Sequence, residues 1–177
     1  GRVLARLTPR STAGRPVRVA AAARREGWVG VRLAERANDE LGWIRERDVR
    51  WVPLRIRVDV DLSARRLLLR RDGAVVMRVR VAVGAPGNPT PTGRFGVTDH
   101  LRPAPGGPYG CCILALSGHQ TKLPPGWPGG DRLAIHGTSN EATIGGAVSS
   151  GCLRARARDL RILLRRVPVG ATVVVRA

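Results

Sequence analysis

One nine-residue stretch, 54–62, constrains the fold more tightly than any other part of this chain. Its apolar residues stand at every second position, with a charged residue between each pair. Because successive side chains of a β-strand point to opposite faces, this period of two predicts a strand with one buried face. The apolar positions are Leu54, Ile56, Val58, Val60 and Leu62, and the charged positions are Arg55, Arg57, Asp59 and Asp61.

A second alternating run occupies residues 75–83, and a triple leucine at 67–69 lies between the two runs. The sequence Arg71-Asp72-Gly73 predicts a hairpin turn, since aspartate followed by glycine suits the positive φ angles of such turns. These segments together predict an antiparallel meander with one face in the core. Aromatic residues make up only 3% of the chain, so that core must be built mostly from Val, Leu, Ile and Ala.

Residues 157–167 have helical spacing instead. Leu160, Leu163, Leu164 and Val167 follow the i, i+3, i+4, i+7 pattern of one helix face. A proline at 168 and a glycine at 170 are typical of a helix end. The residues after them, 172–175, predict a closing strand.

The first 52 residues are predicted to form a separate unit. Its strand-like segments are 3–6, 16–19, 28–33 and 41–44. The Gly-Trp pairs at Trp28 and Trp43 resemble those of a bacterial SH3-like domain, which implies a small β-barrel over residues 1–52. Such a module docks the cell wall or its own neighbour; alternatively the unit is a structural cap with both tryptophans in its core. Residues 50–53 would be the linker to a second domain at 54–177.

The formal net charge of +18 restricts the partners of the chain. It is compatible with nucleic acid, an anionic membrane or an anionic wall polymer. Nucleic acid is the weakest of these, because the arginines are scattered and there is no zinc-finger spacing, basic heptad helix or aromatic–basic interleaving. We therefore expect attraction to an anionic cell wall, screened by salt, with no nucleic-acid partner and no specific protein partner.

Three cysteines, Cys111, Cys112 and Cys152, leave at least one thiol free. Adjacent cysteines rarely bond each other, because disulfide geometry strains the peptide between them. We therefore expect Cys111 and Cys112 in a strand, with at least one of them in the core. No Cys-x-x-Cys pair and no cluster with metal-ligand spacing occurs, so we expect neither a metal nor a cofactor.

The third cysteine and one histidine lie in two short motifs. Residues 136–138 read His-Gly-Thr, and residues 149–154 read Ser-Ser-Gly-Cys-Leu-Arg. A cysteine nucleophile needs a base to take its proton and backbone donors to hold the oxyanion that it creates. The motifs therefore have the parts of a Cys–His acyl-transfer site. The alternative is a buried cysteine in a strand and a surface histidine near a turn.

These motifs, together with Pro-Thr-Pro-x-Gly-x-Phe at 89–95, resemble the catalytic domain of the L,D-transpeptidases of the YkuD type. The opening strand at 56–62, the Asp-Gly hairpin at 72–73 and the closing segment at 166–174 also fall where that family has them. The resemblance covers residues 54–177. It implies a mainly β fold, a β-sandwich with one short C-terminal helix, and an enzyme without a cofactor.

The resemblance also implies a peptidoglycan enzyme that works outside the cytoplasmic membrane. Such an enzyme cleaves a tetrapeptide stem, releases D-Ala and passes the acyl group to a diaminopimelate-type side-chain amine, which forms a 3→3 cross-link. Two alternatives remain: an L,D-carboxypeptidase that uses water as the acceptor, and a wall-binding module with weak or no catalysis. No signal peptide opens the sequence and no run of 18 apolar residues occurs, so we expect any secretion or anchor signal to lie outside it.

The family's roles carry over to the matching positions of this chain. Cys152 would be the nucleophile, and His136 would accept its proton and return it to the leaving amine. Gly137 and Thr138 would position the imidazole, one of them through its carbonyl. The backbone N–H groups of Gly151 and Cys152 would form the oxyanion hole.

One position departs from the family pattern. Ser150, beside Ser149, stands where the family often has histidine, which puts any role of a second histidine in doubt. Arg154 would bind a substrate carboxylate or shape the pocket, and the alternative is a structural hydrogen bond to the loop. Tyr109 is a candidate wall of the pocket. His119 would line the substrate cleft, and the alternative is a loop histidine in solvent.

Overall fold

The computed structural model describes residues 3, 6–10 and 16–177. Its elements in chain order are β1 (Ala20–Arg25), β2 (Trp28–Arg32), β3 (Gly42–Arg45), η1 (Glu46–Asp48), β4 (Ile56–Asp61), β5 (Arg66–Arg71), β6 (Ala74–Gly84), β7 (Gly93–Leu101), β8 (Ile113–His119), β9 (Arg132–His136), η2 (Glu141–Thr143), β10 (Ala147–Ser149), β11 (Leu153–Ala155), α1 (Ala157–Arg166) and β12 (Thr172–Arg176). The predicted strand at 3–6 includes Leu4 and Ala5, which lie outside the described residues. The segment 16–19 is not a strand, although Pro16 forms an isolated bridge to Arg10.

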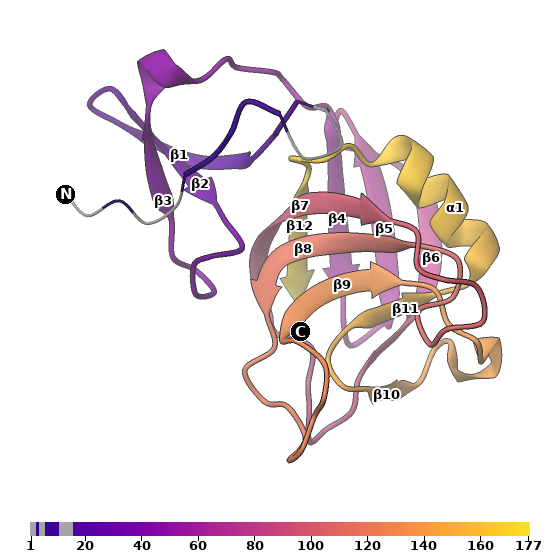
Figure 1. Ribbon diagram of the computed structural model, residues 1–177. Helices are drawn as coiled ribbons and strands as arrows, with labels where there is room; N and C mark the ends of the chain where they lie inside the picture. The colour runs from indigo at the N-terminus through magenta and orange to yellow at the C-terminus, as the bar shows by residue number, and fades with distance from the viewer. Residues whose placement is uncertain (1–2, 4–5, 11–15) are drawn as a thin grey trace.

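Eight of the strands form a closed barrel of mixed direction (Figure 1). Around the barrel the order is β6-β11-β9-β8-β7-β12-β4-β5, and β5 then pairs with β6 to complete the ring. The predicted β-sandwich is therefore wrong, because the sheet closes on itself and does not split into two facing layers.

The eleven-residue strand β6 is the reason that the ring closes. Its first part, Ala74–Arg80, pairs antiparallel with β5 across the predicted Asp-Gly turn. The same strand then pairs with β11 at Val81 and Ala82, and with β10 at Val83 and Gly84. One long strand thus supplies hydrogen-bonding partners to three others along its length.

The barrel interior follows the predicted alternation. Val58 and Val60 of β4 and Leu67 and Leu69 of β5 are at most 2% exposed and belong to the main hydrophobic core. Leu54, at the start of the alternating run, is instead 37% exposed because β4 begins only at Ile56. The period of two therefore identified the buried face correctly but placed the start of the strand two residues too early.

The helix α1 confirms the predicted helix to within one residue. Leu160 and Leu163 are fully buried in the barrel core, as the helical spacing requires. Arg156 at the N-cap offers no side-chain bond, and the Glu141 carboxylate instead accepts a hydrogen bond from the Ala157 N–H at 2.9 Å. In the described part of the chain, no helix is long and apolar enough to cross a membrane.

The N-terminal strands β1, β2 and β3 form an open three-stranded antiparallel sheet beside the barrel (Figure 1). The predicted closed SH3-like barrel is therefore wrong, because three strands are too few to close a sheet. Trp28 and Trp43 are 38% and 42% exposed, so they are not core residues either. An arginine stacks on each ring, Arg45 on Trp28 at 4.9 Å and Arg25 on Trp43 at 5.7 Å from the ring centroid.

The N-terminal sheet is joined to the barrel at the end of β8. The Asn38 side chain donates to the His119 carbonyl and accepts from the His119 N–H, both at 2.8 Å. The His119 ring also lies against the Ala34 carbonyl, with Nε2 at 2.7 Å. Farther along, a Cβ on Gly96 of β7 would lie 2.7 Å from the Ala20 methyl, so the two sheets are in direct contact there.

Candidate active site

The predicted catalytic residues lie on or directly beside two neighbouring parallel strands, β9 and β11. Leu153 is paired with Ile135, and Arg154 is paired with His136. Leu153 and Ile135 are buried in the core, so by the alternation of strand side chains His136 and Arg154 lie on the outer face. Cys152 directly precedes β11, and its sulfur lies 3.8 Å from the Arg132 carbonyl at the start of β9. The nucleophile and base candidates therefore come from adjacent strands.

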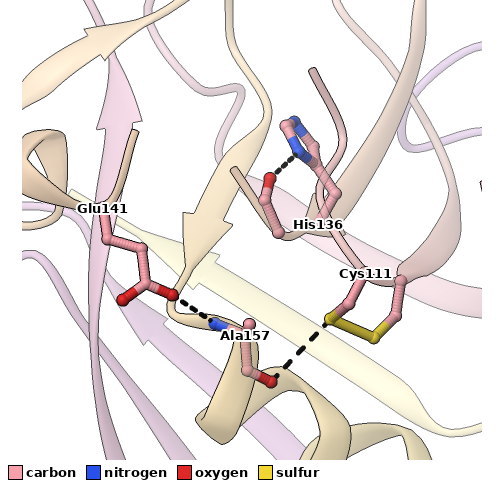
Figure 2. Close-up of a disulfide and its surroundings, with 6 residues drawn as sticks. Cys111, His136, Glu141 and Ala157 are labelled. Atoms are coloured by element: carbon pink, nitrogen blue, oxygen red, sulfur yellow. Dashed lines mark hydrogen bonds between the residues drawn. A yellow bond between two sulfur atoms is a disulfide. The ribbon is translucent and has the colours of Figure 1, made fainter. Parts of the chain in front are cut away.

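The imidazole of His136 is buried and oriented. Only 4% of the residue is exposed, and its Nδ1 lies 2.5 Å from the Gly137 carbonyl (Figure 2). A carbonyl can only accept, so Nδ1 carries the hydrogen and Nε2 keeps its lone pair free for a proton. Burial lowers the pKa of His136 to about 4; the Gly137 carbonyl opposes this shift, and the positive charge of Arg154 adds to it. The histidine is therefore a neutral base at neutral pH.

Cys152 is the one free cysteine of the described residues, and it is half-buried. Burial raises the pKa of its thiol, while the Ala134 backbone N–H and the charge of Arg154 partly oppose that shift. The resting thiol and imidazole are therefore both neutral. A reaction between two neutral groups of this kind transfers the proton during attack and needs no preformed thiolate–imidazolium pair.

The turn before Cys152 is held by Ser149. Its hydroxyl donates to the Cys152 carbonyl at 2.6 Å and accepts from the Gly151 N–H at 3.1 Å. The Gly151 N–H, predicted as an oxyanion donor, is thus engaged by Ser149 in this conformation. Gly151 has a φ of 117°, and a Cβ there would collide with the Gln120 side chain, so only glycine fits.

Gln120 is a site residue that the sequence analysis missed. It is only 5% exposed, and its Nε2 lies 3.1 Å from the Ser150 carbonyl, 3.0 Å from the Pro89 carbonyl and 3.3 Å from the Asn88 carbonyl. Its Oε1 accepts from the Lys122 N–H at 2.9 Å. Gln120 therefore ties the turn that delivers the nucleophile to the proline loop and to the long loop after β8. No local pattern marks a glutamine for this role.

The segment 109–111 packs against the segment 136–138 with almost no free space. The Tyr109 ring meets the His136 ring edge-on, with 5.0 Å between centroids. A Cβ on Gly110 would lie 2.6 Å from the Thr138 nitrogen, and one on Gly137 would lie 2.9 Å from the Tyr109 carbonyl. Tyr109 therefore packs against the candidate base. The Thr138 hydroxyl faces the following turn, where it accepts from the Asn140 N–H at 3.1 Å.

Arg154 lies within electrostatic range of both reacting residues, since its charge affects the pKa of His136 and of Cys152. Within the part of the chain that the structure describes, its buried Nε has no hydrogen-bond acceptor. Of the two predicted roles for Arg154, this favours a contact with a bound anion over a structural bond to the loop.

His119 is not a loop histidine free in solvent. Besides its bonds to Asn38 and Ala34, its Nδ1 lies 3.0 Å from the Asp131 carboxylate. It therefore joins the N-terminal sheet to the end of the long loop 120–131. Asn38 and Ala34 are 81 and 85 positions away from it, a separation that no local pattern indicates.

Cys111 and Cys112 form a disulfide with each other, contrary to the sequence-based expectation (Figure 2). They lie in the turn before β8, which begins only at Ile113, so no strand ladder holds the peptide between them extended. The Cys112 carbonyl accepts from the Gly137 N–H at 3.1 Å, next to His136. The Cys111 sulfur lies 3.8 Å from the Ala157 carbonyl at the start of α1.

Across residues 3, 6–10 and 16–177, no group of three or more His, Cys, Asp or Glu side chains could hold a metal ion. The chemistry on hand is that of a thiol, an imidazole, a guanidinium and backbone amides.

Comparison with solved structures identifies the fold. An L,D-transpeptidase of Mycobacterium tuberculosis is similar with a TM-score of 0.57 at 18% identity, over 91% of this chain and 93% of that one. A second L,D-transpeptidase, LdtMt1 in complex with imipenem, is similar with a TM-score of 0.54 at 18% identity, over 84% of this chain and 66% of that one. The first match extends beyond the barrel, so the open N-terminal sheet is part of the shared fold.

Sequence comparison identifies the family. A Bacillus subtilis protein assigned to the L,D-transpeptidases under the name YkuD is 36% identical over 118 residues, which is 67% of this chain. The chain spans 64% of the length of that relative. The family model of the L,D-transpeptidase catalytic domain matches residues 55–175. The matched residues contain nearly the whole barrel. The chain therefore belongs to the L,D-transpeptidase family.

Proposed function

We propose that this chain is a peptidoglycan L,D-transpeptidase in which Cys152 is the nucleophile and His136 the general base. The family implies peptidoglycan stem peptides as substrate and a location outside the cytoplasmic membrane. The observation that carries the proposal is the placement of a neutral imidazole, with a free Nε2, on the same face of adjacent strands as the only free thiol of the described residues.

In the first half-reaction, the thiol proton passes to His136 Nε2 as the sulfur attacks the carbonyl of the L,D peptide bond in a tetrapeptide stem. The tetrahedral oxyanion collapses, the C–N bond breaks, and the imidazolium returns the proton to the leaving nitrogen of D-Ala. The product is a thioester on Cys152. In the second half-reaction, a diaminopimelate-type side-chain amine attacks the thioester and forms the 3→3 cross-link, while His136 accepts the amine proton and passes it to the departing sulfur.

The oxyanion forms next to the Cys152 N–H, which we assign as the first donor of the oxyanion hole. The Gly151 N–H becomes a second donor when Ser149 releases it. Ser149 also supports the turn through the Cys152 carbonyl, and Ser150 supports it through the bond to Gln120.

Arg154 is proposed to bind a carboxylate of the stem peptide. Its buried Nε has no acceptor in the described residues, and a carboxylate would satisfy it with a charge-assisted bond. Tyr109, which packs edge-on against the His136 ring, is proposed as a wall of the pocket.

We also propose a boundary at residue 53 between the two units. Residues 54–177 would carry out the chemistry, and residues 1–52 would dock the enzyme, with the exposed Trp28 and Trp43 as contact residues. The hydrolytic alternative, an L,D-carboxypeptidase, shares the same thioester and differs only in the acceptor that attacks it.

The test is mass analysis of products from purified tetrapeptide muropeptides, with and without an acceptor stem. We expect cross-linked dimers and released D-Ala with the acceptor present, and an imipenem adduct on Cys152. Cys152→Ala should abolish both, whereas Ser150→His should change the rate only modestly. Release of D-Ala by the Cys152→Ala variant would refute the mechanism, and tripeptide without dimer would favour the carboxypeptidase.

A further inference from the structure

A concave surface lies between the N-terminal sheet and α1. It is a groove of about 1230 Å³ that follows β7, with the N-terminal sheet on one side and α1 on the other. Its arginines come from segments far apart in the sequence: Arg18, Arg32, Arg102, Arg132, Arg161 and Arg165. Only two carboxylates, those of Glu35 and Asp99, belong to the same lining. We refer to this surface as the basic groove.

The positive charge of the basic groove is only partly balanced in the described part of the chain, where the charge of Asp39 acts on Arg32 without a close ion pair. None of the six arginines forms an ion pair with a carboxylate of the described residues. Arg161 and Arg165 stand one turn apart on α1, and like charges at this spacing weaken a helix. Arg132 is held in place by the Leu116 carbonyl and the Thr98 hydroxyl, which are uncharged. An anion in the groove would relieve this repulsion.

The lining also indicates what kind of anion fits. Arginine binds phosphate through paired N–H groups, and an extended groove with several arginines suits a chain of phosphates. Proteins that bind single-stranded nucleic acid add aromatic side chains on which bases stack. The described lining of the basic groove has no Trp, Tyr or Phe; Trp28, Trp43 and Trp51 line an adjoining groove, which shares Arg18 and Leu33 with this one.

We propose that the basic groove binds a phosphate-bearing anionic polymer of the cell wall. The choice of the wall as its source rests on the proposed function, which places the enzyme there. The groove shares β9 with the active site: the Arg132 side chain lines the groove, while its carbonyl lies 3.8 Å from the Cys152 sulfur. A polymer held in the groove keeps the barrel next to its substrate and raises the effective substrate concentration without touching the reacting atoms.

The test measures binding of purified poly(glycerol phosphate) wall polymer as a function of NaCl concentration. The double variant Arg161→Gln/Arg165→Gln removes two groove charges with a residue that preserves helix propensity. The matched control, Arg71→Gln/Arg78→Gln, removes two exposed charges on β5 and β6 that have no ion pair in the described residues. We expect the groove variant to bind at least tenfold more weakly and the salt slope of log K to decrease by about 1 to 2. The control should bind within about twofold of the unmodified protein.

Arg102→Gln, outside α1, provides a second variant in case the helix is disturbed, and it should lose about threefold in affinity. Equal losses of affinity in the groove and control variants would overturn the proposal in favour of a net-charge effect. Unchanged affinity in both variants would also overturn it. Equally tight binding of single-stranded DNA with the same number of phosphates would also overturn it. Acylation of Cys152 by imipenem, measured in parallel, should be unchanged in all variants. Absence of acylation in the unmodified protein would refute the proposed function and leave the polymer result interpretable.

Discussion

At the residue scale, burial controls the protonation of both reacting side chains. His136 is held neutral by its surroundings and oriented by the Gly137 carbonyl, while the Cys152 thiol is held protonated. Because both groups are neutral, the thiol resists oxidation and metal binding at rest. In the proposed mechanism it becomes nucleophilic only as it attacks a substrate carbonyl and loses its proton to His136.

The lowered pKa of His136 predicts a specific dependence of stability on pH. Between its ordinary value of 6.5 and about 4, the unfolded chain binds a proton that the folded protein does not, so the free energy of unfolding falls as the pH falls. The contribution amounts to roughly 3 kcal/mol across this window. Urea unfolding at pH 7 and pH 4.5 should show a steeper loss for the unmodified protein than for His136→Gln. Parallel losses in the two proteins would contradict the assigned pKa shift.

Gln120 predicts a loss of rate without a loss of fold. Gln120→Ala removes the donor that holds the Ser150 carbonyl. The turn before Cys152 is then free to shift relative to His136. We expect the rate of acylation by imipenem to fall about 10- to 100-fold, with a smaller change in the concentration for half-maximal rate.

Gln120→Glu is the matched variant, because it keeps the acceptor for the Lys122 N–H and places a carboxylate against three carbonyls. It should lose at least as much rate as Gln120→Ala. Full activity in the glutamate variant would show that the carbonyl contacts do not position the nucleophile.

At the element scale, the turn 109–111 acts as the support for the end of β9. Two glycines, Gly110 and Gly137, let the backbones of the two segments approach within contact distance, and the disulfide between Cys111 and Cys112 follows directly in the chain. The position of His136 therefore depends on a turn that begins 27 residues earlier in the chain.

Two glycine variants, at positions 106 and 110, distinguish the cost of backbone strain from the cost of a steric collision. Gly106 and Gly110 both have positive φ angles, 78° and 62°, but only Gly110 has a neighbour where a Cβ would stand. Gly106→Ala should cost only the strain of its φ, about 1 kcal/mol, and keep full activity. Gly110→Ala should cost more and slow acylation, because it displaces Thr138 and the His136 main chain. Equal stability and activity in the two variants, measured by urea unfolding and imipenem acylation, would contradict this packing.

At the scale of the whole molecule, the two sheets are joined next to the active site. Asn38 and His119 form the junction, and the following residue is Gln120, which holds the nucleophile turn. A displacement of the N-terminal sheet is therefore transmitted to the site through a single peptide unit. The position of the N-terminal sheet and the geometry of the turn before Cys152 are therefore coupled.

The junction predicts how readily the N-terminal sheet detaches. Asn38→Ala removes two hydrogen bonds to His119, worth about 1–2 kcal/mol together, and should speed proteolytic cleavage around residues 50–53 several-fold. Asn38→Asp keeps the acceptor for the His119 N–H and loses only the donor, so it should be intermediate. Limited trypsin digestion followed by mass analysis measures the rate. Cleavage of the alanine variant at the unmodified rate would place the junction elsewhere.

Much of the fold was determined by local patterns. The alternation at 54–62 predicted β4, the Asp-Gly turn predicted the β5–β6 hairpin, and the leucine spacing at 157–167 predicted α1. These succeeded because strand and helix periods are set by backbone geometry within a few residues. The two motifs around His136 and Cys152 could also be recognised in the sequence, because cysteine chemistry requires particular residue types at close spacing.

Other features were decided only by the tertiary structure. Closure of the barrel depends on β6 pairing with strands from both ends of the domain, and the place of His119 depends on Asn38, 81 residues away. Gln120 acquired its role from carbonyls about 30 residues distant on either side. The exposure of Trp28 and Trp43 likewise depends on which surfaces of the N-terminal sheet are left uncovered. The disulfide depends on where β8 begins. The sequence by itself determined the central strands and the helix and proposed Cys152 and His136 as the catalytic pair. The fold decided what surrounds them, because hydrogen bonds and packing between distant segments have no periodic signature in the sequence.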